Sequence, residues 1–279
     1  MKPAPFDYLR PDTLDEALSV LAQHGEDVRP MAGGQSLGAM LNMRIVTPAI
    51  LLDLNWLQEL AVIDGRTTGA LVRQRDALDH AALRTAVPLL AQALPHVGHY
   101  QTRNRGTLGG SVAHADPSAE IPLTLATLGG EVELRSKQKI RRVPATDFFR
   151  SALVTARQPD ELLTKLHWPA VGLATRTAFM EFSVREGDFA IVAVACVLDE
   201  GLGRLRLGFG GCGETPQIVA RDELGRFEAR IIDDVLAEAT ASLDYRSDLL
   251  ATAAYRRQLA QVLGRQAVSQ ALKREAAHA

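Results

Sequence analysis

The chain has 279 residues, of which 47% are hydrophobic, so it is long enough for one large domain or two ordinary ones, each with its own core. The formal net charge of -2 provides no basic footprint, and we therefore expect neither nucleic acid nor a membrane surface as a partner. The longest apolar run, residues 189–198, is about half of the roughly 20 residues that span a bilayer, and the N-terminus lacks the apolar core of a signal peptide. We expect a cytoplasmic protein.

Helical and extended patterns alternate along the first part of the chain. The clearest helix covers residues 13–25, where Thr13 and Glu16 have capping-box spacing and Gly25 can end the helix. The other predicted elements are a short extended segment in residues 28–34 that breaks at its two glycines, a helix that opens at Ser36, a buried strand at 49–54, a helical stretch at 77–94 with a break or first turn at Pro88, a helix at 120–128 and a hairpin at 131–143.

The pattern changes after Pro169. Strands followed by helices are typical of an α+β domain, and we place a domain boundary near this point. We expect a larger domain over residues 1–172 and a smaller α+β domain, with a three-stranded antiparallel sheet and helices, over residues 175–277. The three predicted strands of the smaller domain are 177–184, 189–198 and 204–211, and its helical part begins near residue 227.

The sequence contains two cysteines, Cys196 and Cys212. Cys196 lies in an apolar stretch, which is typical of a buried small residue. Two thiols do not indicate a disulfide scaffold, and they cannot supply the four ligands that an iron–sulfur cluster usually needs. Electrons from such a cluster would have to come from another chain.

Two glycine-rich segments carry the most specific signal. Residues 31–38 read MAGGQSLG, and residues 106–117 read GTLGGSVAHADP. Because glycine has no Cβ, the amides of such turns can approach an anion closely, and a helix that follows adds its N-terminal dipole. Neither segment has the spacing of a Walker A or a Rossmann motif. One such loop is most often a simple turn, whereas two loops that converge suit a pyrophosphate approached from both sides.

A family resemblance supports this interpretation. With their flanks, the two segments read PMAGGQSLGAMLNMR and TRNRGTLGGSVAHADPSAEIPLTLATLGGEVEL. They resemble the signature segments of the FAD-binding medium subunit of molybdenum hydroxylases, a group that includes the carbon monoxide dehydrogenase medium subunit and the flavin domain of xanthine dehydrogenase. PFDYLRPDTLDEAL resembles the family's opening, and VREGDFAIVAVACVL the start of its C-terminal domain. The resemblance implies a p-cresol-methylhydroxylase-type FAD-binding domain of two α+β subdomains, followed by a smaller C-terminal α+β domain.

The resemblance also implies which residues contact FAD. Glu120, thirteen residues after Thr107, would accept hydrogen bonds from ribityl or ribose hydroxyls, although many members of the family have Asp there. Val97 and Leu163 would form an apolar wall near the flavin. The two loops would hold the pyrophosphate, with contacts from Met31, Ala32, Gly33, Gly34, Gln35, Ser36, Leu37, Thr107, Gly109, Gly110 and Ser111.

In this family, a large subunit with a molybdenum cofactor hydroxylates the substrate. Electrons then pass through a small subunit with two iron–sulfur clusters to FAD, and on to an external acceptor such as NAD, oxygen, a quinone or a cytochrome. The resemblance therefore implies an electron-transfer subunit of a heterotrimer, for which we name no catalytic side chain. Two alternatives stay open at this point: a self-contained FAD-dependent reductase or oxidase of a small molecule, and a non-enzymatic module that binds a nucleotide.

A few residues allow competing interpretations. His114, Asp116 and Glu120 could suggest a metal site, but no further imidazole or thiolate follows at ligand spacing, and we predict no metal. Several relatives have a lysine near the flavin where this chain has Met180 and Glu181, which implies a lower flavin potential unless Arg185 or a partner chain replaces the cation. The roles of Arg103 and Arg105, before the second loop, stay open between pyrophosphate neutralisation and solvated or subunit-facing charge.

Overall fold

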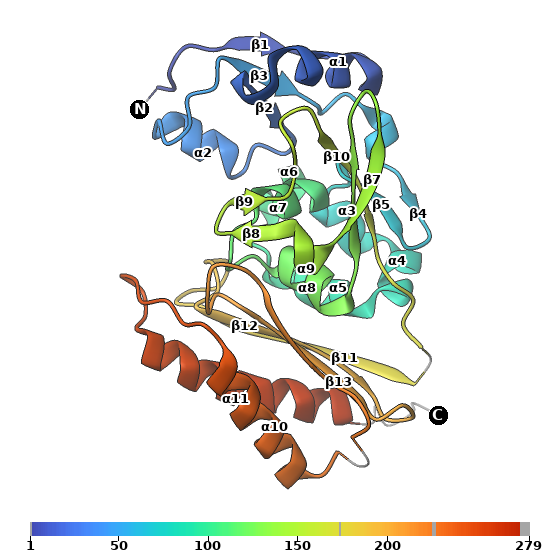
Figure 1. The fold of residues 1–279 in the computed structure, drawn as a ribbon, viewed down its shortest axis with the longest axis vertical. Helices are drawn as coiled ribbons and strands as arrows, with labels where there is room; N and C mark the ends of the chain where they lie inside the picture. Colours follow the sequence, from blue (N-terminus) through green and yellow to red (C-terminus); the bar gives the residue numbers. More distant parts are fainter. Residues whose placement is uncertain (1, 173, 225–226, 274–279) are drawn as a thin grey trace.

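The computed structural model describes residues 2–172, 174–224 and 227–273, which form three stacked layers (Figure 1). We call them the upper layer (residues 2–60), the middle layer (residues 61–168) and the lower layer (residues 174–273). Each layer has one main sheet, and helices pack against each of these three sheets. The fold is α+β, as the sequence predicts.

The upper layer is a small parallel sheet with strand order β1-β3-β2, and α1 packs against it. The expected cap of α1 is present, because the Thr13 hydroxyl accepts a hydrogen bond from the Glu16 amide (3.2 Å) and Gly25 ends the helix with φ +52°. The elements are β1 (Asp7–Leu9), α1 (Leu14–His24), η1 (Gly25–Asp27), β2 (Val28–Met31), α2 (Leu37–Asn42), β3 (Ile50–Asp53) and η2 (Gln58–Leu60).

The middle layer contains an antiparallel sheet with strand order β4-β5-β10-β6-β7, and helices cover one face of it. The predicted helical stretch 77–94 is divided into short helices. His80 caps α4 by accepting from the Leu83 amide (3.1 Å), and Pro88 is the first residue of α5. The strands are β4 (Ile63–Asp64), β5 (Thr67–Gly69), β6 (Glu131–Arg135), β7 (Ile140–Pro144), β8 (Phe149–Ser151), β9 (Val154–Thr155) and β10 (Leu162–His167). The helices are α3 (Gln74–Asp79), α4 (Ala81–Ala86), α5 (Pro88–Ala93), η3 (Leu94–His96), α6 (Tyr100–Arg105), α7 (Leu108–His114), α8 (Glu120–Leu128) and α9 (Ala145–Phe148).

The sheet of the lower layer has four strands rather than the predicted three. The predicted strands correspond to β11, β12 and β13, and the additional strand β14 pairs with β13 at the edge. Strand β14 was not predicted because it is only half-buried, and its sequence therefore lacks the apolar run seen in the neighbouring strands. The elements are β11 (Thr175–Phe182), β12 (Val192–Asp199), β13 (Arg204–Gly210), β14 (Gln217–Arg221), α10 (Ala229–Ser242) and α11 (Ala253–Leu272).

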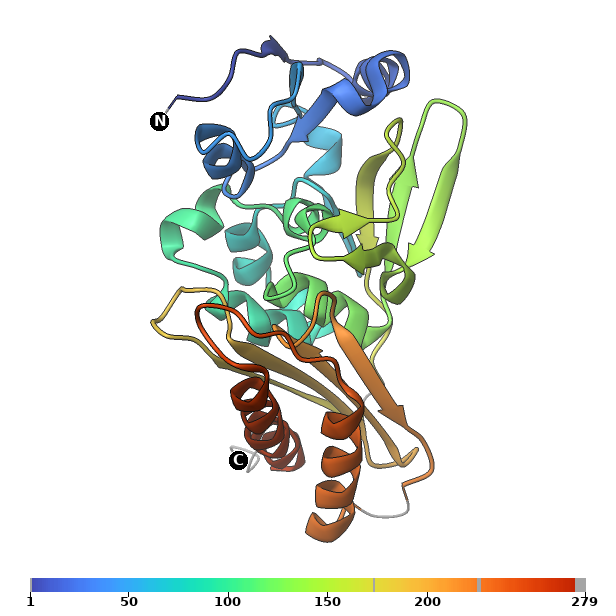
Figure 2. The same cartoon turned by 60° about the vertical axis from the view of Figure 1, so that its left-hand side comes forward.

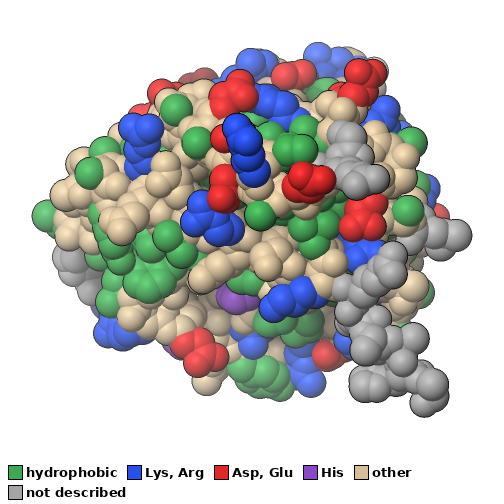
Figure 3. Space-filling view, turned by 90° about the horizontal axis from the view of Figure 1, so that it is seen from below, with side chains coloured by type: hydrophobic (Ala, Val, Ile, Leu, Met, Phe, Trp, Pro, Cys, Tyr) green, Lys and Arg blue, Asp and Glu red, His purple; other side chains and the backbone are tan. Residues whose placement is uncertain are grey.

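The sheet of the lower layer is covered on both faces. Helices α10 and α11 lie below it, and α5 and α8 of the middle layer lie above it (Figures 1 and 2). Leu89, Leu123 and Phe179 meet in a buried apolar cluster that joins the two layers. On the underside, acidic and basic side chains are interspersed (Figure 3). Within the described residues, no helix combines the length and apolar character needed to cross a membrane.

The middle and lower layers also share polar contacts beside the second glycine loop. The Gly211 amide donates to the Pro117 carbonyl (2.8 Å), and Arg246 Nη2 donates to the Ser118 hydroxyl (3.0 Å). Arg256, fully buried on α11, donates in turn to the Gly211 carbonyl (2.8 Å). The domain limits stay predictions, and the expected end of the second domain at 274–277 lies outside the described residues.

Candidate functional site

A cavity of about 590 Å³ lies between the upper and middle layers, and one turn of the lower layer also lines it. A volume of this size is typical of sites for small molecules and cofactors. Both glycine-rich segments line the cavity, together with Val97, Glu120 and Leu163. Thirteen of the fourteen residues that the family resemblance implies therefore lie at one cavity. The exception is Met31, whose Sδ would lie 3.6 Å from a Cβ at Gly34 and which supports the first loop from behind.

The first glycine loop presents backbone donors. Within the described chain, the amides of residues 33–37 have no acceptor, while the next amide, that of Gly38, closes onto the Gly34 carbonyl (2.9 Å). Gly34 has φ +71°, a conformation that glycine adopts without strain. Because an amide without a partner is costly in a dry site, these groups are suited to a ligand that brings acceptor oxygens.

The second glycine loop differs from the expectation that its amides also face an anion. The amides of Leu108 and Gly109 donate to the Val72 and Ala70 carbonyls (2.9 and 3.0 Å), and the Gly110 amide donates to the Thr107 hydroxyl (2.9 Å). These amides are already used to join the loop to the middle layer and to cap α7. The second loop can therefore offer mainly the hydroxyl protons of Thr107 and Ser111, both of which line the cavity.

The two loops touch each other. A Cβ at Gly33 would lie 2.1 Å from the Arg105 carbonyl oxygen, and one at Gly110 would lie 3.5 Å from the Ala32 Cβ. The loops therefore face one cavity from adjoining walls, which is the arrangement that a shared diphosphate requires. Gly109 is required for a different reason, since its Cβ would lie 2.6 Å from Ala70 Cα.

Val97 and Leu163 supply apolar surface at the cavity, and both are buried. Arg103 does not act as a free counter-charge. It donates to the Val97 and Gly98 carbonyls (3.0 and 2.8 Å) and so fixes the turn that carries Val97. Arg105 is exposed, and its backbone carbonyl rather than its side chain makes the contact with the first loop.

A buried carboxylate, Glu120, lies at the first position of α8 and lines the cavity. Burial, with repulsion from Asp116, raises the pKa of Glu120 to about 7. On β11, the Oε2 of Glu181 is buried and has no hydrogen-bond partner in the described part of the chain. Burial together with the charge of Glu120 raises the pKa of Glu181 to about 8. The two carboxyl groups therefore hold protons near neutral pH. Met180 packs against the core on the other face of the same strand.

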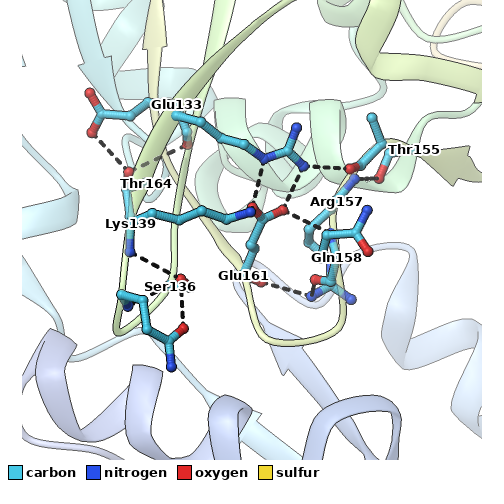
Figure 4. Close-up of polar contacts among 11 residues, drawn as sticks. Glu133, Ser136, Lys139, Thr155, Arg157, Gln158, Glu161 and Thr164 are labelled. Carbon is cyan, nitrogen blue, oxygen red and sulfur yellow. Dashed lines mark hydrogen bonds and ion pairs between the residues drawn. The ribbon is translucent and has the colours of Figure 1, made fainter.

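The cavity has lining residues that the sequence did not single out. Arg29 and Arg157 bring two guanidinium groups. Arg157 Nη1 is held by the carbonyls of Gln158 (2.9 Å) and Glu161 (2.7 Å), within the polar cluster shown in Figure 4. Glu161 is fully buried and accepts both arms of Arg141 at 2.6 and 2.7 Å, which fixes this loop against β7.

The lower layer contributes the turn between β11 and β12. Gly187, Asp188 and Phe189 line the cavity, and Phe189 is 56% exposed. Gly187, with φ +82°, packs against the ring of His99, since a Cβ there would lie 2.4 Å from Cε1. Arg185 at this turn pairs with Asp188 at 3.0 Å. A glycine within an otherwise charged turn, REGD, was the signal that could have indicated this close approach.

His96, His114 and Asp116 are further titratable residues in the segments on either side of the second glycine loop. His114 and Asp116 line the cavity, and burial lowers the pKa of His114. His96 packs on Phe179 with a ring separation of 5.3 Å. No cluster of three His, Cys, Asp or Glu side chains that could hold a metal ion occurs in the described parts of the chain.

Known protein families match almost the full length of the chain. Residues 4–171 match the family described as "FAD binding domain in molybdopterin dehydrogenase", and residues 177–271 match the "CO dehydrogenase flavoprotein C-terminal domain". The beta subunit of caffeine dehydrogenase from a Pseudomonas species is 35% identical, over 98% of this chain and 97% of that subunit. The medium chain of carbon monoxide dehydrogenase from Afipia carboxidovorans is 31% identical, over 98% of this chain and 99% of its own.

Solved structures give the same relationship. A chain of reconstituted CO dehydrogenase from Oligotropha carboxidovorans superposes with a TM-score of 0.91 and 31% identity, covering 97% of this chain and 99% of that chain. A chain of quinoline 2-oxidoreductase from Pseudomonas putida 86 superposes with a TM-score of 0.89 and 34% identity, covering 97% of this chain and 98% of that one.

Proposed function

Because the chain belongs to the family of FAD-binding medium subunits of molybdenum hydroxylase-type dehydrogenases, we propose that it relays electrons through FAD from the iron–sulfur clusters of a partner subunit to an external acceptor. The chain is an oxidoreductase subunit, and its cofactor is FAD. When bound, FAD accepts electrons from one redox centre and passes them to another. The role of the protein is to bind and orient this group and to exclude water from it.

The observation that carries the proposal is the meeting of the two glycine loops at one cavity. The unpaired amides of residues 33–37 would donate to the diphosphate, and the hydroxyls of Thr107 and Ser111 would donate from the adjoining wall. The buried side chains of Val97 and Leu163 would exclude water from the apolar part of the ligand. Glu120 would accept hydrogen bonds from the hydroxyls of the linker.

The cysteines support an external source of electrons. Cys196 and Cys212 are both free and buried, and burial raises the pKa of each thiol to about 12. Because thiolates are the form that binds iron, these thiols are unsuited to hold a cluster. We therefore propose a small partner subunit with two iron–sulfur clusters and a large partner subunit with the molybdenum cofactor. Free thiols are also typical of a reducing compartment, and we place the complex in the cytoplasm.

The experiment is to purify the wild-type chain, incubate it with FAD and remove unbound ligand. We expect a yellow protein that releases FAD on heat denaturation. Reduction of the bound flavin should require the partner subunits together with their substrate. A chain that stays colourless would overturn FAD binding. A chain that reduces an acceptor with a small molecule as sole partner would favour a self-contained flavoenzyme over an electron relay.

A further inference from the structure

We propose that Asn55 and Arg73 are positioning residues that clamp the two glycine loops together and so set the shape of the cavity wall between them. Neither side chain is among the residues that line the cavity, so the clamp acts from behind the loops. The part of the inference that concerns the diphosphate of FAD rests on the proposed function, whereas the clamp itself concerns only this chain.

Asn55 forms the end of the clamp at the first loop. Its Nδ2 donates to the Ala32 carbonyl (2.7 Å), directly before the two glycines, and to Asp53 Oδ1 (2.5 Å). The side chain thus reaches from the end of β3 to the end of β2 and holds the first loop at its base.

Arg73 forms the end of the clamp at the second loop. Its Nη2 donates to Asn55 Oδ1 (2.6 Å), and its Nη1 donates to the Arg105 carbonyl. That carbonyl is the same group that Gly33 approaches most closely. The hydrogen bonds therefore run without interruption from the Ala32 carbonyl through Asn55 and Arg73 to the backbone of the second loop.

The clamp has its own support in the upper layer. Asp53 is buried, and its Oδ2 accepts from the Tyr8 hydroxyl (2.6 Å) while its Oδ1 accepts from the amide and the side chain of Asn55. Burial alone would raise the pKa of Asp53, but the bonds from Tyr8 and Asn55 outweigh it and hold this pKa below its ordinary value. Asp53 is therefore a fixed carboxylate that orients the Asn55 amide with its oxygen toward Arg73.

The clamp matters because the first loop cannot hold its own shape. The amides of residues 33–37 have no acceptor in the described chain, so the loop's internal hydrogen bonds are few. Preorganised donors bind a ligand more tightly than donors that must be ordered on binding. Loss of either clamp residue should therefore loosen the first loop, even though the hydrogen bonds that the Arg73 side chain makes within the described residues go to Asn55 and to the Arg105 carbonyl beside the second loop.

The test compares the full-length chain with Asn55→Leu and Arg73→Met, using Arg75→Met as the matched control. Arg75 lies two residues after Arg73 and bonds Asp79, and Tyr100 and Asn104 of α6. It therefore contacts α6 ahead of the second loop, but no bond from its side chain to Asn55, to the Arg105 carbonyl or to the first loop occurs among the described residues. Amide hydrogen exchange is measured without FAD. Amides without an acceptor exchange quickly in any case, so the readout is the two hydrogen-bonded amides that close the first loop, those of Gly38 and Met40, which donate to the Gly34 and Ser36 carbonyls (2.9 and 3.1 Å). We expect both amides to exchange about tenfold faster in both clamp variants, with the sheet of the lower layer unchanged. The control should match the wild type.

Ligand binding provides the second readout. The dissociation constant for FAD should rise by about tenfold to a hundredfold in each clamp variant, while that for riboflavin, which lacks the diphosphate, should change by less than about twofold. The double variant should lose no more affinity for FAD than the weaker-binding single variant. The reason is that the loss of either side chain breaks the same chain of hydrogen bonds between the two loops. Arg73→Lys, which can reach only one of the two acceptors at a time, should fall between wild type and Arg73→Met.

Three results would overturn the clamp. Exchange of the Gly38 and Met40 amides at the wild-type rate in Arg73→Met would show that the two loops are not coupled through this side chain. If the losses of FAD binding free energy in the two single variants add up in the double variant, Asn55 and Arg73 act independently and do not form one bridge. A parallel fall in riboflavin affinity, FAD affinity and melting temperature would show general destabilisation. If the wild-type chain binds no FAD, the proposed function fails, and hydrogen exchange still decides on the clamp.

Discussion

Gly33 packs directly against the backbone of Arg105, so closely that a Cβ at position 33 would lie 2.1 Å from the Arg105 carbonyl oxygen. A separation of this size is below any real contact between carbon and oxygen, so only glycine fits. The first glycine of the signature segment is therefore required by contact between two parts of the protein. Gly109 is required for the same reason, because it packs against the backbone of Ala70. Gly34 is required for a different reason, since it adopts a left-handed backbone conformation in the first loop.

Gly33→Ala should separate the two loops and reduce FAD content after purification by about tenfold or more, because a methyl group forced against backbone cannot be accommodated by a side-chain movement. FAD released by heat per mole of protein measures this directly. The control is Gly38→Ala, in the helix that follows, where a Cβ meets nothing within 4 Å.

Gly38→Ala should retain full FAD and gain slightly in stability, since alanine is favoured over glycine in a helix by about 1 kcal/mol. Equal FAD content in the two variants would contradict the close approach of the loops.

The Thr107 hydroxyl has two roles that can be separated. It accepts from the Gly110 amide (2.9 Å) as the cap of α7, and within the described residues its proton has no acceptor, so it can donate into the cavity. Thr107→Val should lose both roles, weaken FAD binding by about tenfold and destabilise the chain by about 1 kcal/mol. Thr107→Ser keeps the hydroxyl and should restore both, which calorimetric binding and urea unfolding can measure. If Ser fails to rescue binding, the methyl group rather than the hydroxyl is the important part.

The regular elements could be predicted because their signals are local. The cap at Thr13, the stop at Gly25 and the first-turn proline of α5 each depend on residues within one or two turns. Strand β14 could not be predicted in the same way. Its five residues are half-buried at a sheet edge, and the pairing with β13 supplies what the sequence pattern lacks.

The features of the candidate site likewise differ in whether local sequence signals could predict them. The two glycine loops can be recognised in the sequence. Their meeting at one cavity could be predicted because a single diphosphate would need both loops. The role of Asn55 was not visible, because it depends on a strand that returns beside Ala32 after more than twenty residues. The use of the second loop's amides was also hidden, since their acceptors at Ala70 and Val72 lie in a segment far back in the chain. Tertiary partners, not local preference, decide these groups.

The protonation of Glu120 should make FAD binding depend on pH. Burial raises its pKa to about 7, and as a hydrogen-bond acceptor for ligand hydroxyls it should bind best when ionised. The affinity for FAD should therefore increase by about tenfold between pH 6 and pH 8, as the fraction of ionised Glu120 rises. Fluorescence titration of FAD at several pH values measures this.

In Glu120→Gln the dependence on pH should disappear. His114→Gln serves as the control for the neighbouring imidazole, which also lines the cavity, and it should keep the slope. An unchanged slope in Glu120→Gln would assign the titration to another group.

Glu181 should destabilise the chain at alkaline pH. Its folded pKa of about 8, raised by burial and by Glu120, lies above the ordinary value of 4.5, so the folded chain binds more protons than the unfolded chain between these two values. The free energy of unfolding must then fall as pH rises through this window. Glu181→Gln removes the ionisation, and after allowance for partial solvent screening we expect the variant to be about 1–3 kcal/mol more stable than wild type at pH 8.5.

At pH 5 the two chains should be nearly equal in stability, since Glu181 is then protonated in the folded state and resembles glutamine in charge. Urea unfolding without FAD at both pH values gives the comparison. Glu186→Gln, an exposed position on the same β11–β12 turn, is the matched control and should leave the stability unchanged at either pH. A gain for Glu181→Gln that is equally large at pH 5 would show that packing, not the buried charge, is the cause.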